Sequence, residues 1–277
     1  MLTFYHNIDL DGKCSGYVVK RAHPDCNLYG IDYGDDFPWD IVEKHNTIVM
    51  VDFSLQPFSE MEKLANKCEK LIWIDHHKSA IDEYLKTTIT TEGILRDGIG
   101  ACQLCWEYFF PTESVPYFIK LLAEYDVWWF RNPDTLPFQY GLRLENTNPY
   151  NLPLWESLFE RPIVREVIKR GETVLRYEEI INERYVKSRG FELEWEGLKF
   201  ICCNKGLTNS KLFDSIWDTT KYDAMMTFCM LDPERGWTVS LYSDKSDVDV
   251  SKIAKKYGGG GHKGAAGFQC KTLPFVQ

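Results

Sequence analysis

Histidine and aspartate residues gather at three points in the first half of the chain. In chain order these residues are His6, Asp9, Asp11, Asp52, Asp75, His76 and His77. Imidazole nitrogen and carboxylate oxygen suit manganese and similar divalent ions. Two aspartates separated by one residue, such as Asp9 and Asp11, can serve two neighbouring ions. This pattern indicates a divalent-metal site.

The aspartate pair alone is weak evidence, because a solvated turn or a helix N-cap uses the same residues. The pair of histidines is stronger, since it follows the apolar run Leu71–Ile74 and Asp75. Clustering polar groups there without a partner costs stability. Asp126 lies in an aromatic, apolar segment that predicts a helix, and the sequence barely separates a ligand from a surface aspartate there.

A glycine run near the end of the chain is followed by a histidine and a lysine. The residues that we expect to bind an anion are Gly259, Gly260, Gly261, His262 and Lys263. Consecutive glycines let backbone N–H groups turn toward a phosphate, and the two side chains add donors or positive charge. The alternative is a flexible linker. It is disfavoured because the run leads into small residues and an aromatic strand start at Phe268.

The metal-ligand candidates stand at the ends of predicted strands. Residues 2–5, 47–51 and 71–74 are short apolar runs, and helical patterns lie between them. This alternation predicts an α/β fold whose N-terminal part is a mostly parallel sheet flanked by helices. Ligands of such sheets bind beyond the carboxyl ends of the strands, so the polar groups are expected to converge there.

The second half predicts a connecting helix and a smaller mixed α/β domain. Residues 162–190 have apolar positions at helical spacing and no interior proline. Strands are expected at 191–203, 224–231 and 237–242, with a turn at 232–236. The predicted domains are therefore residues 1–150 for metal binding and catalysis, 151–189 for the connection, and 190–277 for substrate binding.

Composition limits the function. The chain has 277 residues, 44% of them hydrophobic, and a net charge of -9, which argues against gripping long nucleic acid. A small anionic substrate remains compatible, because metal ions offset nearby carboxylates. Nine scattered cysteines favour a reducing compartment, and Cys102 and Cys105 are expected to be core thiols of a buried helix at 101–110. With no leader and no membrane span predicted, we expect a cytoplasmic protein.

Taken in order, these motifs resemble the DHH phosphoesterase family with a C-terminal DHHA1 domain. The motifs are the segment 6–12, Asp52, Asp75-His76-His77, Asp126 and the glycine-rich segment 258–268. The resemblance spans nearly the whole chain. It is closest to the group of nanoRNase B-like oligoribonucleases and cyclic-nucleotide phosphodiesterases.

The resemblance implies two divalent ions, Mn²⁺ first with Mg²⁺ or Co²⁺ as alternatives. The implied ligands of one ion are His6, Asp9 and Asp52, and those of the other are Asp11, Asp52, His76 and Asp126. Asp52 would bridge the ions, Asp75 would orient a histidine, and His77 would lie beside the substrate phosphate. Water activated by the ions would attack phosphorus. His262 and its glycine loop would bind the substrate end.

The resemblance also implies a hydrolase that trims short oligoribonucleotides to mononucleotides, with phosphoadenosine phosphate or cyclic nucleotides as further substrates. The alternatives are a RecJ-like single-strand exonuclease and a catalytically silent nucleotide sensor. No long duplex or membrane partner is expected, and a homodimer is compatible. Many relatives carry an arginine where this chain has Tyr242, so recognition of the substrate end is expected to differ.

Overall fold

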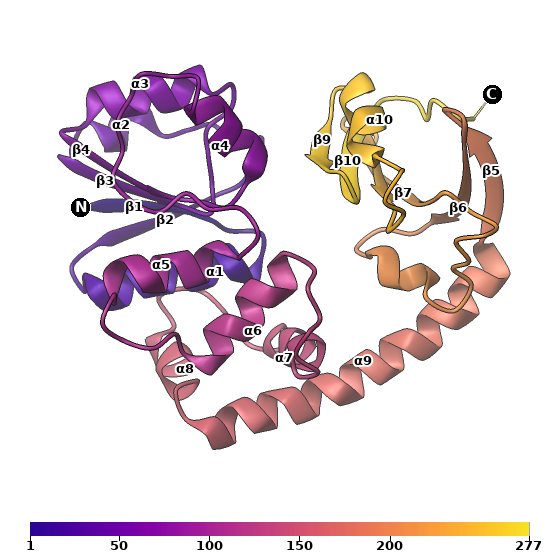
Figure 1. Ribbon diagram of the computed structural model, residues 1–277, viewed down its shortest axis with the longest axis horizontal. Coiled ribbons are helices and arrows are strands. Elements are labelled where there is room, and N and C mark those ends of the chain that lie inside the picture. The colour runs from indigo at the N-terminus through magenta and orange to yellow at the C-terminus, as the bar shows by residue number, and fades with distance from the viewer. Residues whose placement is uncertain (277) are drawn as a thin grey trace. The chain divides into compact units, whose positions relative to one another are not determined.

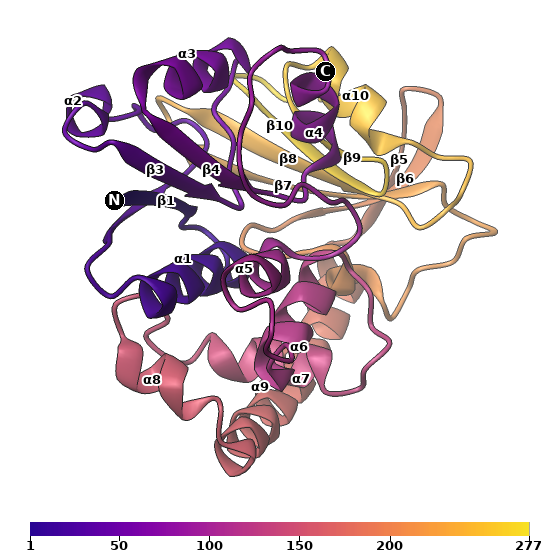
Figure 2. The same cartoon turned by 60° about the vertical axis from the view of Figure 1, so that its left-hand side comes forward.

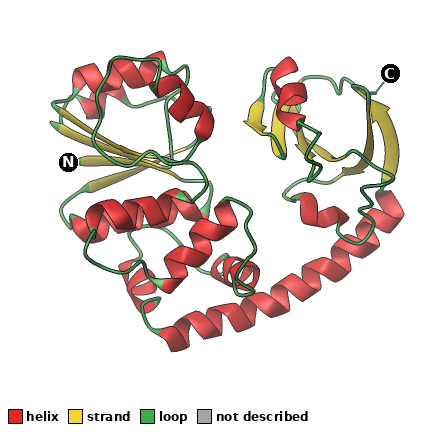
Figure 3. Cartoon of the chain, viewed as in Figure 1, coloured by secondary structure: helices red, strands yellow, loops and turns green. Residues whose placement is uncertain are grey.

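The structure is a computed structural model that describes residues 1–276, and it forms two compact units. The first is Met1–Leu175 and the second is Arg176–Gln277. The division falls inside the long helix α9 (Arg161–Arg189), within the predicted connecting segment. Figure 3 shows that each unit has its own sheet and helices. Among the described residues, no helix combines the length and the apolar character needed to cross a bilayer.

The first unit contains a four-stranded parallel sheet in the order β2-β1-β3-β4. Its strands are β1 (Leu2–His6), β2 (Asn27–Ile31), β3 (Thr47–Val51) and β4 (Lys70–Ile74). The predicted parallel sheet is confirmed. The edge strand β2 was not predicted, because only its last residue is buried and its pattern is not the apolar run of a central strand.

Figure 1 shows α2, α3 and α4 on one side of this sheet and α1 and α5 on the other, with α6, α7 and α8 beyond α1 and α5. The helices are α1 (Leu10–Ala22), α2 (Trp39–Val42), α3 (Ser59–Lys67), α4 (Lys78–Tyr84), α5 (Ala101–Phe109), α6 (Tyr117–Asp126), α7 (Thr135–Leu142) and α8 (Leu152–Ser157). Successive strand residues point to opposite faces of the sheet. Tyr5 therefore packs in the core with α1 and α5, and Phe4 packs in the core with α2 and α3. Figure 2 shows α1 and α5 side by side below the sheet.

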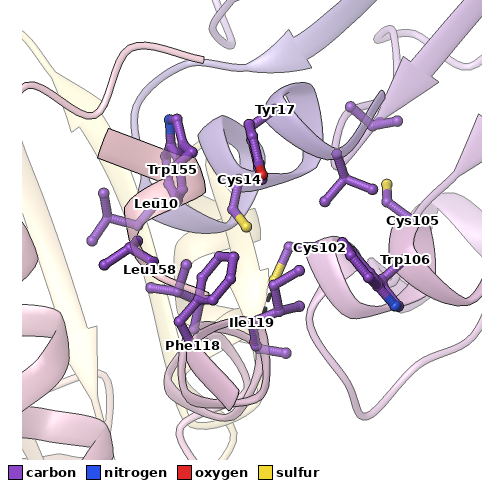
Figure 4. Close-up of a cluster of buried hydrophobic side chains, with 14 of the residues drawn as sticks. Leu10, Cys14, Tyr17, Cys102, Cys105, Trp106, Phe118, Ile119, Trp155 and Leu158 are labelled. Atoms are coloured by element: carbon purple, nitrogen blue, oxygen red, sulfur yellow. Dashed lines mark hydrogen bonds between the residues drawn. The ribbon is translucent and has the colours of Figure 1, made fainter. Parts of the chain in front are cut away.

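The core below the sheet joins α1, α5, α6 and α8 (Figure 4). Cys102 and Cys105 are free thiols buried in this core, as predicted, and burial raises the pKa of Cys105 well above its ordinary value. Trp155 stacks on Tyr17 with ring centroids 5.3 Å apart. This packing fixes the helix ends that reach the carboxyl edge of the sheet.

The second unit contains a six-stranded mixed sheet in the order β5-β6-β7-β8-β10-β9. Its elements are β5 (Phe191–Trp195), β6 (Leu198–Asn204), the 3-10 helix η1 (Ser210–Phe213), β7 (Ala224–Asp232), β8 (Gly236–Tyr242), α10 (Val250–Lys256), β9 (Gly260–His262) and β10 (Ala265–Cys270). The predicted mixed domain is confirmed. The single strand expected at 191–203 is wrong, because Glu196 and Gly197 adopt positive φ and turn the chain into a hairpin.

Candidate metal centre

Three adjacent parallel strands deliver polar side chains to one edge of the first sheet. His6 is the last residue of β1, Asp52 follows β3, and Asp75 follows β4. The backbone N–H of Asp52 donates to the carbonyl of Ile74, at 2.9 Å, which ties two of these strand ends together. The convergence expected at the carboxyl edge is present.

One group of side chains surrounds His6. Its Nδ1 lies 3.1 Å from Oδ2 of Asp9 and 3.6 Å from Oδ2 of Asp52. Asp9 is the N-cap of α1, and its Oδ1 accepts from the N–H of Gly12 at 2.9 Å. A Cβ on Gly12 would lie 2.0 Å from the carbonyl oxygen of His6. Glycine therefore permits α1 to begin this close to the ligand-bearing strand end.

A second group surrounds His76. Its Nε2 lies 3.0 Å from Oδ2 of Asp126, the last residue of α6, and 4.0 Å from Oδ2 of Asp11. Asp11 is buried, and its two oxygens accept from the backbone N–H groups of Ala101 at 2.6 Å and Cys102 at 3.0 Å. These groups belong to the first turn of α5, the positive end of that helix. The buried charge of Asp11 is thereby stabilised and fixed in place.

Asp52 lies between the two groups and contacts both. Its Oδ2 faces His6, and its Oδ1 lies 3.3 Å from Nε2 of His76. The residue is 1% exposed, and neither carboxylate oxygen accepts a hydrogen bond in the described part of the chain. Its backbone has φ of 55°, a conformation that is strained for a residue with a side chain. A buried carboxylate in this state fits a ligand shared by two cations.

Asp75 contacts the two histidines that follow it. Its Oδ1 accepts from the backbone N–H groups of His76 at 2.7 Å and His77 at 3.1 Å, and it lies 2.7 Å from Nδ1 of His77. Its Oδ2 accepts from Nε1 of Trp73 at 3.2 Å. The histidine ring that Asp75 contacts is therefore that of His77.

The aspartates dominate the electrostatics of the centre. Burial alone would lower the pKa of each histidine. Contacts with carboxylates outweigh it and raise the pKa of His6 to about 10, that of His76 to about 12 and that of His77 to about 9. Burial would raise the pKa of Asp52, but the nearby imidazoles of His6 and His76 lower it. The three histidines are therefore expected to be protonated at neutral pH, and a bound cation would have to displace the proton of a histidine that it coordinates.

Asp32 and Tyr33 are neighbours of the centre that the sequence prediction missed. Oδ1 of Asp32 lies 3.9 Å from Nε2 of His6 and accepts from the N–H of Asn7 at 3.1 Å. The ring of Tyr33 lies 5.5 Å from that of His6. Asp32 directly follows β2, so the signal was an acidic residue after a strand that was itself not recognised.

Three groups of possible ligands, of three or four residues each, lie close together. Within each of three sets, one ligand atom from every residue lies within 4.8 Å of the others. The sets are Asp52, Asp75, His76 and His77; His6, Asp9 and Asp52; and Asp11, His76 and Asp126. All eight predicted residues of the centre thus lie in one continuous cluster, and the donor set fits divalent cations.

Two known proteins are similar to this chain over nearly its whole length. No family model matches the chain. The uncharacterized protein R106 of Acanthamoeba polyphaga mimivirus is 27% identical over 297 residues, covering 96% of this chain and 66% of that protein. Oligoribonuclease NrnB of Bacillus subtilis (strain 168) is 23% identical over 312 residues, covering 96% of this chain and 72% of that protein. The chain thus spans about two thirds of the viral relative.

Two solved structures share the fold over nearly the whole chain. The pGpG-specific phosphodiesterase PggH from Vibrio cholerae has a TM-score of 0.51 at 14% identity and covers 97% of this chain and 92% of its own. An exopolyphosphatase-related protein from Bacteroides fragilis has a TM-score of 0.54 at 15% identity and covers 98% and 87%. At these identities the likeness to the two structures is one of fold.

The glycine segment forms a hairpin in place of the expected loop. Gly260–His262 is the edge strand β9, paired antiparallel to β10. A Cβ on Gly259 would lie 2.0 Å from the carbonyl oxygen of Gly267, and Gly261 has φ of 132°. The glycines therefore serve close strand packing. His262 is exposed, and the ammonium of Lys263 donates to the carbonyl of Ser246.

Tyr242 ends β8 next to this hairpin. It pairs in register with Ala265 of β10, and its hydroxyl donates to the carbonyl of Thr208 at 3.5 Å. Strand β8, Gly236–Tyr242, contains no arginine that could substitute for the one found in many relatives. The hairpin and the end of β8 together make the surface for which the sequence predicted a role in substrate binding.

Proposed function

We propose that this chain is a DHH phosphoesterase that hydrolyses phosphoester bonds in short nucleotides, with oligoribonucleotides of a few residues as its main substrates. The observation that carries the proposal is the pair of oxygens of Asp52, each buried without a hydrogen bond and each facing a different histidine. One cation would be held by His6, Asp9 and Asp52. The other would be held by Asp11, Asp52, His76 and Asp126.

Two such cations lower the pKa of a water molecule and stabilise charge on a reacting phosphate. The protein would hold the side chains that coordinate these cations in fixed positions. Asp11 is fixed by the first turn of α5, and Asp9 by its N-cap bond to Gly12. The side chain of Asp126 comes from the end of α6. Ligands from the sheet edge and from the ends of α1 and α6 therefore meet with little reorganisation.

His77 is proposed to bind the substrate phosphate. Its Nδ1 lies 2.7 Å from Oδ1 of Asp75, which fixes the ring and directs the Nδ1 proton toward that carboxylate. Nε2 is then the nitrogen that can donate to a phosphate oxygen. Asp75 acts through His77, as a positioning residue.

The substrate class rests on several supports. The relative from Bacillus subtilis is named an oligoribonuclease, and the Vibrio structure is named a pGpG-specific phosphodiesterase. The net charge of -9 disfavours long nucleic acid. Manganese is the proposed physiological cation because the donors are imidazole and carboxylate, with magnesium and cobalt as alternatives. The hairpin residues Gly259–Lys263 are proposed to bind the substrate end.

A substrate panel tests the proposal. Purified protein with Mn²⁺ is offered linear dinucleotides, five-residue RNA, phosphoadenosine phosphate, cyclic dinucleotides, pyrophosphate and long single-stranded DNA, and kcat/KM is compared. The highest value is expected for the shortest linear RNA. A maximum on long single strands would replace the proposal with a RecJ-like exonuclease, and no turnover of any substrate would favour a nucleotide sensor.

His76→Ala tests whether the activity belongs to this centre. Loss of residues that only orient metal ligands costs about 10–100-fold, so loss of a ligand is expected to cost more. His23→Ala is the matched control, because His23 is exposed at the end of α1, away from the cluster. Equal turnover by the two variants would remove the centre from the reaction.

A further inference from the structure

Three exposed aromatic residues follow the ligand candidate Asp126. Trp128, Trp129 and Phe130 are 43%, 44% and 39% exposed. Consecutive Cα atoms are about 3.8 Å apart, so the Cα of Trp128 lies within about 8 Å of that of Asp126. Apolar rings clustered on the surface mark binding sites more often than chance packing. We call Trp128, Trp129 and Phe130 the aromatic segment.

The backbone holds the aromatic segment in a defined conformation. The N–H of Trp128 donates to the carbonyl of Tyr125, and that of Trp129 to the carbonyl of Glu124, both at 2.9 Å. Trp128 has φ of 57°, which is costly for a bulky side chain. Strain of this kind persists where surrounding structure fixes it, and it concentrates at functional sites. Among the described residues of the first unit, the other non-glycine residue with positive φ is Asp52, at 55°.

Two arginines accompany these rings. The guanidinium of Arg131 lies 4.1 Å from the ring centroid of Trp129. Nη2 of Arg143 donates to the hydroxyl of Tyr125 at 3.0 Å, and the ring of Tyr125 lies 5.4 Å from that of Trp128. Neither arginine takes part in a salt bridge within residues 1–276. Exposed rings with unneutralised arginines are the combination that binds bases and backbone of single-stranded nucleic acid.

The metal centre also has an exposed ring beside His6. Tyr33 is 49% exposed, and its ring lies 5.5 Å from that of His6 and 4.5 Å from that of Phe53. His6 and Asp126 belong to different ligand groups, and Asp52 lies between those groups. Tyr33 therefore lies beside the His6 group, and the aromatic segment directly follows Asp126 of the His76 group along the chain.

We propose that Tyr33 and the aromatic segment stack on the two nucleobases that flank the scissile phosphate, and so select linear dinucleotides. The inference rests on the proposed function and narrows it. A phosphate held at the centre has a nucleoside on each side only in a diester, so pyrophosphate and phosphoadenosine phosphate leave at least one ring surface unused. The arginines beside the aromatic segment suit the negative charge of the adjoining phosphate.

Kinetic discrimination is the first test. The substrates are a linear diadenosine dinucleotide and the same sugar–phosphate diester without bases. Base stacking on an aromatic side chain contributes a factor of about 5 to 150 per base. Trp129→Ala is expected to reduce the ratio of kcat/KM between the two substrates by that factor, mainly through KM. Trp129→Phe is expected to restore most of it.

The control is Tyr177→Ala, which removes an exposed ring from α9 (67% exposed) and is expected to leave the ratio unchanged. If dinucleotide hydrolysis proceeds and Trp129→Ala leaves the ratio at its wild-type value, the stacking surface is wrong while the proposed function stands. If the wild-type protein cleaves neither substrate, the proposed function fails. The nucleotide-binding measurement below then tests the stacking surface by itself.

Binding is measured without turnover and with chelator present. Adenosine monophosphate is expected to quench tryptophan fluorescence saturably, whereas ribose 5-phosphate is not, and the quench is expected to disappear in a Trp128→Phe, Trp129→Phe double variant. A quench that persists in that variant contradicts the inference. A changed sedimentation coefficient of Trp129→Ala with an unchanged quench would also contradict the inference, because it would make the aromatic segment a protein interface.

Discussion

The two carboxylate oxygens of Asp11 accept hydrogen bonds from the backbone N–H groups of Ala101 and Cys102, at 2.6 and 3.0 Å. A ligand candidate on the first helix is thus held by the first turn of a helix 90 residues away in sequence. Backbone dipoles at the start of α5 favour this carboxylate, but burial and the charges of Asp52 and Asp126 raise its pKa well above the ordinary value, so its charge needs a bound cation as partner.

Gly100→Ala is expected to weaken this arrangement. The new Cβ would lie 2.8 Å from Oδ1 of Asp11 and 2.6 Å from the Cα of Ala123, so α5 must shift. We expect a loss of about 1–3 kcal/mol in the free energy of unfolding and weaker Mn²⁺ binding. Calorimetric titration and denaturant unfolding measure both. Gly260→Ala is the control, since its Cβ meets no atom within 4 Å; equal effects would contradict the account.

Mn²⁺ affinity is expected to increase with pH. Burial would lower the pKa of His76, but Asp126 and Asp52 raise it to about 12, so the metal-free histidine is protonated at neutral pH. A cation must displace that proton, so binding weakens as pH falls and releases protons. Titration in two buffers of different ionisation enthalpy counts the protons. Binding without proton release between pH 6 and 8 would show that His76 is no ligand.

Asp75→Asn is expected to lower the pKa of His77. Burial opposes the charged ring, and the carboxylate of Asp75 is the main group that overcomes it and raises the pKa to about 9. The amide keeps an oxygen for the backbone N–H groups but loses the charge. Nuclear magnetic resonance titration of the metal-free protein follows the ring directly. An unchanged His77 pKa would mean that Asp75 does not set the state of this ring.

His262→Ala is expected to raise KM for dinucleotides about 10-fold with a smaller effect on kcat, because removing a positioned donor to phosphate costs binding first. Gln269→Ala is the control, as Gln269 is exposed on β10 of the same hairpin. Steady-state kinetics with Mn²⁺ separates the two constants. A loss confined to kcat would place His262 in the chemical step and contradict a binding role.

The central strands and the metal cluster could be predicted because burial and chemistry leave a strong local pattern. Strands β1, β3 and β4 are apolar runs; β1 ends in His6, and β3 and β4 are each followed directly by an aspartate. The edge strand β2 could not be predicted, because edge strands have mixed exposure, and Asp32 was lost with it. The role of Asp126 needed the tertiary contact with His76 at 3.0 Å, which no local pattern encodes.

The glycine segment shows a different limit of prediction. Its composition suits a phosphate-binding loop and a close-packed hairpin equally well, since both need residues without Cβ. Only the register of β9 against β10 distinguishes them. The hairpin at Glu196 was missed for a related reason, because a glutamate at positive φ gives no turn signal.

Mn²⁺ stoichiometry tests the central claim most directly, because a shared ligand makes the two ions interdependent. Wild-type protein is expected to bind two Mn²⁺ ions per chain with spin-coupled electron paramagnetic resonance, and Asp52→Asn to lose that coupling and the hydrolysis of dinucleotides together. Asp25→Asn, an exposed aspartate, is the control. Two coupled ions in Asp52→Asn, or a single ion in the wild-type protein, would contradict the centre described here.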